Sequence, residues 1–383
     1  MVATHGNPPP IQLQVAGAAP VPLSFVERGP GVYLVATDPT ARWAREAIRA
    51  PVEVLFPDGR IEYRIGRLVI DPRVVDEVLR DFREKYGDSA WGRFFQGRKR
   101  VLMLEAAVTP GPRTTEAVLR EEFDSIAEGY AAAVAHDPFR QYLRTRSERQ
   151  FERIFAGRDP ILELGPGAGI ETLGLLRAGH RVLAVDVSPR MLDALRRRAD
   201  AAGLSEKLET RLGSIGELET LLGDRPKGSF GGALSTFGAL NLEPHLDRLP
   251  AVLGRALAPG APFFAGILNR WAFCTVAFLL ATGHPRVAWG RLGTPVLVGG
   301  ALYPLEVRPF TAREFARPFH PEFDLEAVES ASVLVPPYGS APLHSFWGGS
   351  GRRRLSRFDE RLARTFPFRE SGEYVFVVLR RAS

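Results

Sequence analysis

One segment constrains the fold of this chain more than any other. An apolar run at residues 160–164 enters a turn that carries Gly165, Gly167 and Gly169, and a helix-forming stretch leaves that turn. Glycines at alternate positions let the backbone pass close to a ligand, and they let the helix pack tightly on the strand. The start of the helix offers free N–H groups to a polar ligand. The segment therefore predicts a strand–turn–helix unit of an α/β fold that binds a ligand.

A second element lies where a nucleoside site needs one. Residues 181–185 form another apolar strand, which ends in Asp186, about twenty residues after the glycines. A carboxylate at such a strand end can accept hydrogen bonds from both ribose hydroxyls of an adenosine. A nicotinamide-binding loop needs its third glycine at position 170, which is Ile170, and no Gly-Lys-Ser/Thr follows. The pattern therefore indicates an adenosine ligand that is neither a dinucleotide nor a nucleoside triphosphate.

The chain changes character near residue 109. Residues 1–108 carry short strand patterns with a few helices, which predicts a small β-barrel-like domain. Residues 109–116 begin with two prolines and a glycine and are interpreted as a linker. Residues 117–383 alternate helices with buried strands, which predicts a doubly wound, Rossmann-like α/β sheet. The run at 373–379 is expected to be a strand at the edge of that sheet. Expected strands elsewhere are 11–15, 32–36, 52–56, 61–70, 101–105, 160–164, 181–185, 233–236 and 261–267, with long helices at 115–135 and 138–155.

Several motifs taken together resemble those of class I S-adenosylmethionine-dependent methyltransferases. Glu163 stands two residues before the first glycine, as the acid of motif I does in that family. The segment 123–130 is similar to the helix that precedes motif I, and 186–192 is similar to motif II. With later motifs the match covers residues 117–270, which we take as the core of the domain. The resemblance implies a Rossmann-like fold and S-adenosylmethionine as the cofactor.

The resemblance also implies which residues contact the cofactor. Glu163 and the loop glycines would hold its methionine end, and Asp186 its ribose. Ser214 stands where the family often has an acid that receives the adenine amino group. The complete implied set is Tyr130, Glu163, Gly165, Gly167, Gly169, Asp186, Val187, Met191, Ser214, Ile215 and Ser235.

The remaining residues bear on the methyl acceptor. The sulfonium methyl group is already activated, so the enzyme mainly has to align a nucleophile and exclude water. A base is needed only if the acceptor must lose a proton, and His245 is the candidate, with a solvated loop histidine as the alternative. The segment 271–383 begins with a long aromatic stretch, which favours a pocket for a small, rather apolar acceptor. A dimer contact or plain core is the alternative for that stretch.

Charge and composition narrow the partners. The net charge is +6, but the basic residues are scattered in short runs. A Pro-Pro-Tyr at 336–338 does not follow the fourth strand, as it does in enzymes that methylate amino groups of nucleic acids, so nucleic acid is not an expected partner. A single cysteine, Cys274, allows no internal disulfide and no thiolate zinc cluster, and we expect no metal and a cytoplasmic location. The apolar stretch 271–282 is too short to span a membrane. A homodimer is left open.

The domain predicted at residues 1–108 also resembles a known family. Residues 31–36, 50–54 and 82–87 are similar to the split-barrel flavin- or deazaflavin-dependent nitroreductase family, although the basic Arg/Lys-Ser-Gly segment of that family has no counterpart before Ser24. Three hypotheses follow. The chain is a small-molecule methyltransferase with a fused barrel, a bifunctional methyltransferase with a flavin-type redox domain, or a non-catalytic regulator that binds S-adenosylmethionine.

Overall fold

The computed structural model describes residues 8–15, 19–36, 41–69, 71–94, 100–106, 114–281, 283, 285–292, 295–335 and 350–383. The chain separates into two compact units, a smaller one of Met1–Ser125 with Leu297–Leu305 and a larger one of Ile126–Val296 with Glu306–Ser383. The division falls inside helix α3 (Thr115–Ala135). Most of the linker expected at 109–116 lies outside the described residues, as does the Pro-Pro-Tyr at 336–338, so the domain borders stay a prediction.

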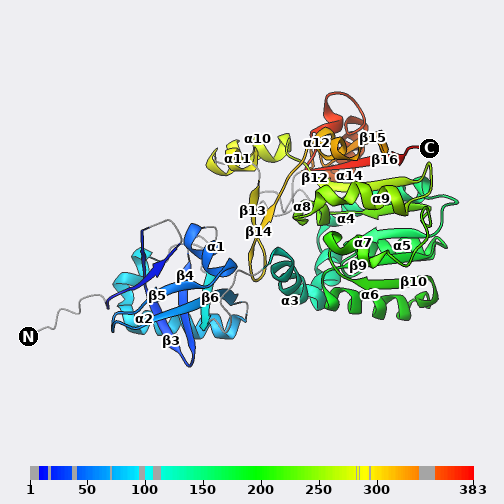
Figure 1. The fold of residues 1–383 in the computed structure, drawn as a ribbon. Helices are drawn as coiled ribbons and strands as arrows, with labels where there is room; N and C mark the ends of the chain where they lie inside the picture. Colours follow the sequence, from blue (N-terminus) through cyan, green and yellow to red (C-terminus); the bar gives the residue numbers. More distant parts are fainter. Residues whose placement is uncertain are drawn as a thin grey trace, which may run out of the picture. The chain divides into compact units, whose positions relative to one another are not determined.

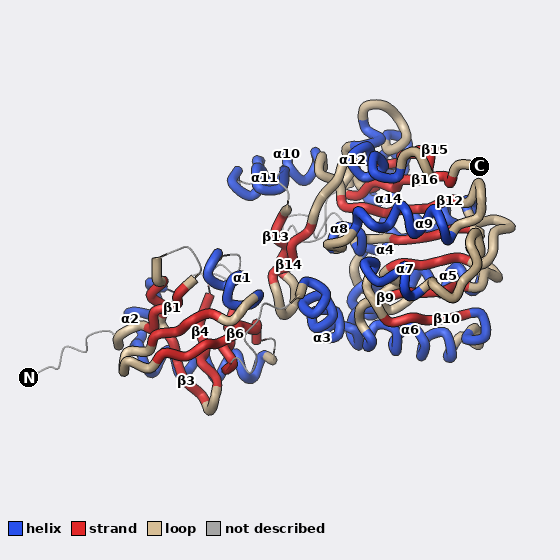
Figure 2. Tube along the Cα trace, in the orientation of Figure 1, coloured by secondary structure: helices blue, strands red, loops and turns tan. Residues whose placement is uncertain are grey.

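The larger unit is built on one seven-stranded sheet with the order β10-β9-β8-β11-β12-β16-β15 (Figures 1 and 2). The first five of these strands run parallel, and β16 is antiparallel to both of its neighbours. The predicted Rossmann-like α/β sheet is therefore confirmed. The strands are β8 (Ile161–Leu164), β9 (Val182–Asp186), β10 (Leu208–Leu212), β11 (Gly232–Ser235), β12 (Pro262–Leu268), β15 (Phe323–Ala331) and β16 (Tyr374–Arg381).

Helices cover both faces of this sheet. Helices α4, α5 and α6 pack with Ile161 and Val182 on one face, and α7, α9 and α12 pack with Leu162 and Leu183 on the other. Neighbouring residues of a strand point to opposite faces, so strands covered on both sides are mostly apolar. The central strands follow this pattern except at Glu163 in β8 and at Asp186 and Ser235, which end β9 and β11. The helices are α4 (Pro138–Ile154), α5 (Ile170–Arg177), α6 (Pro189–Ala201), α7 (Leu218–Leu221), α8 (Ala239–Leu242), α9 (Leu249–Ala256) and α12 (Ala312–Ala316).

The C-terminal strand does not lie at the sheet edge, and that prediction was wrong. β16 lies between β12 and β15, and its five central residues are buried. β15 forms the edge instead. Most of the residues of β15 are exposed or half-buried and several are polar, as suits an edge strand, so its sequence lacks the apolar run by which β16 was recognised.

The segment after β12 leaves the sheet. It forms α10 (Phe273–Ala281) and α11 (Pro285–Leu292), then a hairpin of β13 (Val296–Gly299) and β14 (Pro304–Val307), and α14 (Ser350–Leu362) follows near the C-terminus. Trp271 is 43% exposed and Phe273 is 61% exposed. The alternative of plain core therefore does not hold for these two side chains.

The smaller unit is a barrel-like antiparallel sheet with the order β2-β1-β5-β6-β7-β4-β3. β2 and β3 stand at opposite ends of this order, yet only Ser24 separates them in the chain. The sheet must therefore curl until its two ends meet, which agrees with the predicted barrel. The elements are β1 (Ile11–Gln14), β2 (Val21–Leu23), β3 (Phe25–Arg28), β4 (Gly31–Ala36), α1 (Arg42–Arg49), β5 (Val52–Leu55), β6 (Ile61–Val69), α2 (Pro72–Phe94) and β7 (Arg100–Ala106).

A hairpin from far along the chain completes the smaller unit. Tyr303 is fully buried in the core of the barrel, and the carbonyl of Leu302 accepts a hydrogen bond of 3.2 Å from the N–H of Leu68. The carboxylate of Glu122 accepts hydrogen bonds from three successive N–H groups, those of Ala301, Leu302 and Tyr303. Glu122 is itself buried, so this charge is stabilised by backbone donors, and the tip of the hairpin is fixed by it.

We expect Glu122→Gln to lower the free energy of unfolding of the smaller unit by about 2 kcal/mol, because an amide accepts fewer hydrogen bonds and carries no charge. Urea unfolding followed by circular dichroism measures the change. Glu128→Gln, at an exposed position of the same helix, is the control and should leave the midpoint unchanged. Equal effects of the two substitutions would contradict the assignment.

Candidate functional site

The order of the parallel strands marks where a ligand can bind. The chain leaves β8 toward β9 and β10 and then returns to β11 on the other side of β8. In a doubly wound sheet, a crevice opens at such a reversal, outside the carboxyl ends of the strands. The glycine turn follows β8, and Asp186 ends β9, so both lie at this crevice.

The three loop glycines adopt backbone conformations that favour glycine. Their φ angles are +67° at Gly165, +55° at Gly167 and +73° at Gly169. A Cβ on Gly165 would lie 2.5 Å from Cβ of Ala239, and one on Gly169 would lie 2.1 Å from Cδ1 of Leu195. Gly165 and Gly169 thus permit close packing against α8 and α6. Gly167 has more room, with the ring of Tyr130 3.7 Å from its ideal Cβ position.

Asp186 holds the loop in place. Its Oδ2 accepts a hydrogen bond of 3.0 Å from the N–H of Gly167, and its Oδ1 accepts one of 2.9 Å from the N–H of Ser188. The side chain is buried except for 7% of its surface. One carboxylate therefore joins the end of β9 to the glycine turn after β8, across the crevice between the two strands.

Glu163 is a buried acid beneath the loop. Only 2% of it is exposed, and its Oε2 has no hydrogen-bond partner within the described ranges. Burial raises the pKa of Glu163 to about 8, and the nearby carboxylate of Glu171 adds to this rise. An unpartnered carboxylate oxygen at this depth is costly unless a donor or a positive charge meets it.

The pKa of Glu163 makes the stability of the ligand-free protein depend on pH. The folded state holds a proton on this group up to about pH 8, whereas the unfolded chain loses it near the usual value of 4.5. Raising the pH through this window should lower the free energy of unfolding by on the order of a few kcal/mol. Glu163→Gln cannot ionise, so its loss of stability over the window should be smaller. Urea unfolding at the two ends of the window measures both, and equal slopes would contradict the burial argument.

A polar cluster beside the loop was not found from the sequence. Arg144 on α4 forms a buried ion pair with Glu171 on α5. The guanidinium carbon of Arg144 lies 4.6 Å from the ring centroid of Phe237, and that ring makes an edge contact with Tyr374 at 6.0 Å. Phe237 has φ +54°, a strained conformation for a residue with a side chain, and such strain clusters at functional sites. Nothing local distinguishes Arg144 from other arginines, because its role depends on burial against α5.

The segment that follows β10 forms the other side of the crevice. Ser214 and Ile215 are buried at the start of a short 3-10 helix, Ile215–Glu217, and the N–H of Ser214 donates to Glu217 at 2.9 Å. His245 packs here, since a Cβ on Gly216 would lie 2.8 Å from its ring carbon Cδ2. The candidate base therefore lies against the turn after β10.

The other predicted site residues are placed as follows. Met191 is buried on α6, and its N–H bonds to the capping hydroxyl of Ser188, with Val187 half-buried beside it. Ser235 is buried, and its hydroxyl donates to the carbonyl of Leu164 at 2.9 Å. Ser235 thus joins β11 to β8 through its side chain.

Comparison with known proteins identifies the domain in which these residues lie. Residues 161–260, which include the loop, Asp186 and Ser214, match the family model described as a methyltransferase domain. The chain carries a class I S-adenosylmethionine-dependent methyltransferase domain. Its cofactor is S-adenosylmethionine, as the motifs implied.

Two curated proteins and one solved structure are similar to this chain over its methyltransferase domain. The chain is similar to the ubiquinone biosynthesis O-methyltransferase of Methylocella silvestris, with 29% identity over 208 residues that make up 48% of this chain and 75% of that protein. It is also similar to the demethylmenaquinone methyltransferase of Symbiobacterium thermophilum, with 29% identity over 157 residues, 40% of this chain and 60% of that protein. A solved structure, the CcbJ methyltransferase from Streptomyces caelestis, aligns with 68% of this chain and 98% of its own at 19% identity and a TM-score of 0.45. The names of these proteins do not identify the methyl acceptor of this chain.

No helix in the described ranges is both long enough and apolar enough to cross a membrane. Within the same ranges, no three His, Cys, Asp or Glu side chains are grouped as metal ligands.

Proposed function

We propose that the methyltransferase domain transfers a methyl group from S-adenosylmethionine to a small, rather apolar acceptor. The observation that carries this proposal is the joint position of the positive-φ glycine turn and Asp186 at the reversal of strand order, with aromatic side chains following the next two strands. The first pair suits a nucleoside, and the aromatic side chains suit an apolar partner.

The residues at the crevice fit this cofactor. Asp186 would accept the ribose hydroxyls, while its bond to Gly167 keeps the loop close to the ligand. The unpartnered Oε2 of Glu163 would meet the positively charged methionine end, which explains why a buried acid is retained there. Val187, Met191, Ser214 and Ile215 would surround the adenine, and Tyr130 would cover the loop. Ser235 would act indirectly, by holding β11 against β8.

When bound, S-adenosylmethionine supplies a methyl group already activated by its sulfonium. The chain then has to bind and orient the acceptor and exclude water, which accounts for much of the rate enhancement in such reactions. Phe237 after β11 and Trp271 after β12 follow neighbouring parallel strands, so they lie at the same edge of the sheet. We propose that these aromatic side chains form the acceptor wall. The ubiquinone and menaquinone pathway names of the two relatives support an acceptor with an apolar ring.

The test combines binding and turnover. Calorimetric titration of the full chain with S-adenosylmethionine and S-adenosylhomocysteine should show micromolar binding, equivalent to roughly 8 kcal/mol. Transfer of a labelled methyl group is then measured with small phenols and hydroxylated quinones of increasing apolar size. We expect transfer that increases with apolar size and falls in Trp271→Ala. Cofactor binding with transfer only to polar acceptors would refute the acceptor class, and absence of cofactor binding would refute the whole proposal.

The contact between His245 and Gly216 supports a role on the adenine side of the site, away from the acceptor wall. We therefore expect His245→Ala to weaken cofactor binding by about tenfold, since packing of one ring is worth on the order of 1 kcal/mol, while kcat at saturating cofactor stays nearly unchanged. A base would behave oppositely, with kcat falling by a factor of about a hundred or more and cofactor affinity retained. Titration calorimetry and the transfer assay on the same variant separate the two roles.

A further inference from the structure

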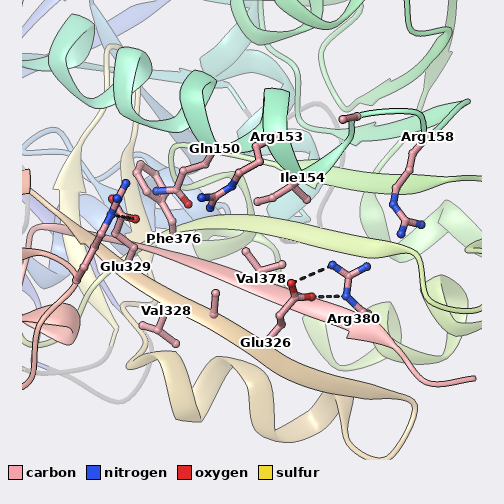
Figure 3. A pocket seen from close by; sticks show the side chains of 13 residues that line it. Gln150, Arg153, Ile154, Arg158, Glu326, Val328, Glu329, Phe376, Val378 and Arg380 are labelled. Carbon is pink, nitrogen blue, oxygen red and sulfur yellow. Dashed lines mark hydrogen bonds and ion pairs between the residues drawn. The ribbon is translucent and has the colours of Figure 1, made fainter.

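A groove opens beside the edge strand of the larger sheet (Figure 3). Its volume is about 560 Å³, and it lies between α4 and the strands β15 and β16. Ile154 and Arg158, which line it, come shortly before β8 begins, whereas the glycine turn follows the end of β8. The groove thus starts near the amino ends of the parallel strands and runs along β16 to Phe376, which pairs with Gly266 of β12. None of its lining residues belongs to the crevice described above. Its volume is in the range of small-molecule sites.

Apolar side chains form part of the groove lining, and of these Ala327 is exposed, Ile154 and Val328 are half-buried, and Phe376 and Val378 are buried. Figure 3 shows Val378 and Phe376 of β16 and Val328 of β15 below α4, with Ile154 above them. β15 is the edge strand, and Ala327 in its centre is exposed within the groove. Apolar side chains at this edge would pack well against a flat or chain-like apolar body.

A buried polar group of the groove lacks a partner. Gln150 on α4 is 95% buried, as its exposed fraction of 5% implies, and its Nε2 has no hydrogen-bond partner among the described residues. Leaving an amide donor unpaired in this way costs about 1–3 kcal/mol. The groove therefore presents a donor that an acceptor atom of a ligand would satisfy.

The charges at the groove do not balance. Four arginines and two glutamates line it. Arg380 pairs with Glu326 and Arg364 pairs with Glu329, which accounts for both acids. Arg153 and Arg158 form neither a direct ion pair nor a side-chain hydrogen bond within the part of the chain that the structure describes. Two cationic groups thus remain at the groove without a direct partner among the described residues, Arg153 on the same helix as Gln150 and Arg158 at the other end of the groove (Figure 3). The hydrogen bond from Arg380 lowers the pKa of Glu326 most, and both groups lie close enough to Glu326 to help lower it.

These observations point to one kind of ligand. We propose that the groove binds a small amphipathic anion, a molecule with an apolar body and a carboxylate, sulfonate or phosphate group. The apolar body would lie on Ala327, Val328 and Ile154. The acidic oxygens would accept hydrogen bonds from Gln150 and Arg153, which Figure 3 shows reaching from α4 toward the strands. This second site goes beyond the proposed methyl transfer and does not depend on it.

The probe for this site is 8-anilinonaphthalene-1-sulfonate, an aromatic sulfonate whose fluorescence rises on binding. Titration of the full chain, with saturating S-adenosylhomocysteine present, should show one saturable site. The neutral analogue N-phenyl-1-naphthylamine, which lacks the sulfonate, should bind at least about tenfold more weakly, because a charge-assisted hydrogen bond contributes that much. A saturable site that appears only when S-adenosylhomocysteine is left out, or equal binding of the neutral analogue, would overturn the proposal.

Variants locate the site. Gln150→Leu and Arg153→Ala should each weaken binding of the sulfonate by about tenfold. Ala327→Trp should block it by filling the groove over an exposed edge position. Arg149→Ala is the matched control, since Arg149 precedes Gln150 on α4, is 65% exposed at its side chain and does not line the groove. Gln150→Leu should also raise the melting temperature, because it removes an unpaired donor. Binding that is absent in the wild type, or equal in all four variants with unchanged melting, would overturn the assignment.

Discussion

Asp186→Ala should lower the affinity for S-adenosylhomocysteine by at least about a hundredfold, because two hydrogen bonds from the ribose to a charged acceptor are lost, each worth 1.5–3 kcal/mol. The substitution also removes a hydrogen bond within the protein. Oδ2 of Asp186 also holds the N–H of Gly167, so the loop is no longer tied to the end of β9. Calorimetric titration of the wild type and the variant measures the change directly.

The control for this prediction is Asp193→Ala. Asp193 lies seven residues further on, on α6, and forms an exposed ion pair with Arg196. Its removal should leave the affinity unchanged, because an exposed pair contributes little and faces solvent. If both variants bind alike, Asp186 has no part in the cofactor site. If the affinity of Asp186→Ala falls together with its melting temperature, Asp186→Asn separates the roles, since the amide keeps one acceptor oxygen for the loop.

Gly169→Ala is expected to destabilise the methyltransferase domain by about 3–5 kcal/mol, through backbone strain and overpacking together. Gly169 has φ +73°, and a new Cβ would lie 2.1 Å from Cδ1 of Leu195, which is fully buried. Because Leu195 cannot move outward, the loop must shift, and cofactor affinity should fall together with stability. Urea unfolding and calorimetry measure the two effects.

Gly203 is a matched control that separates the cost of backbone strain from the cost of a steric clash. Gly203 has φ +68°, nearly that of Gly169, but nothing lies within 4 Å of its ideal Cβ position. Gly203→Ala should therefore cost only about 1–2 kcal/mol, the strain alone. Combining Gly169→Ala with Leu195→Ala should cost less than the sum of the two single changes, because the space left by Leu195 accepts the new methyl group. Strict additivity would mean that the collision with Leu195 does not determine the loss.

Both experiments probe a site that is assembled from separate strands. Glu163 is buried beneath the turn, Asp186 bonds to the turn from β9, and Ser235 fastens β11 to β8. Each bond is local in space but joins residues that are about twenty or more positions apart, a spacing typical of the strand–helix–strand unit. Removing any one of these side chains should therefore change how the others are held. The effects of single substitutions here on stability and cofactor affinity are not expected to be additive.

Four of the six described strands that were missed from the sequence share one property, and the other two, β13 and β14, form a separate sheet of two strands. β10 and β15 end the order of the larger sheet, and β2 and β3 end that of the smaller one. A strand at the end of a sheet has neighbours on one side only, so it needs no continuous apolar run and carries polar residues instead. The central strands, by contrast, are covered on both faces and were predicted within one or two residues.

The sequence by itself determined the strand–glycine turn–helix unit, the acid at the end of the next strand, the doubly wound fold and the cofactor class. The first three follow from residue types at short spacings, because backbone conformation and strand burial act locally. The cofactor class followed from the resemblance of these motifs to class I methyltransferases. Only the tertiary structure decided that Tyr303 completes the barrel, that β16 is internal, that Arg144 and Phe237 border the site, and that Gln150 is left unpaired in a groove. Each of these depends on which distant segments come into contact, and on the burial that results, neither of which a local pattern of residues contains.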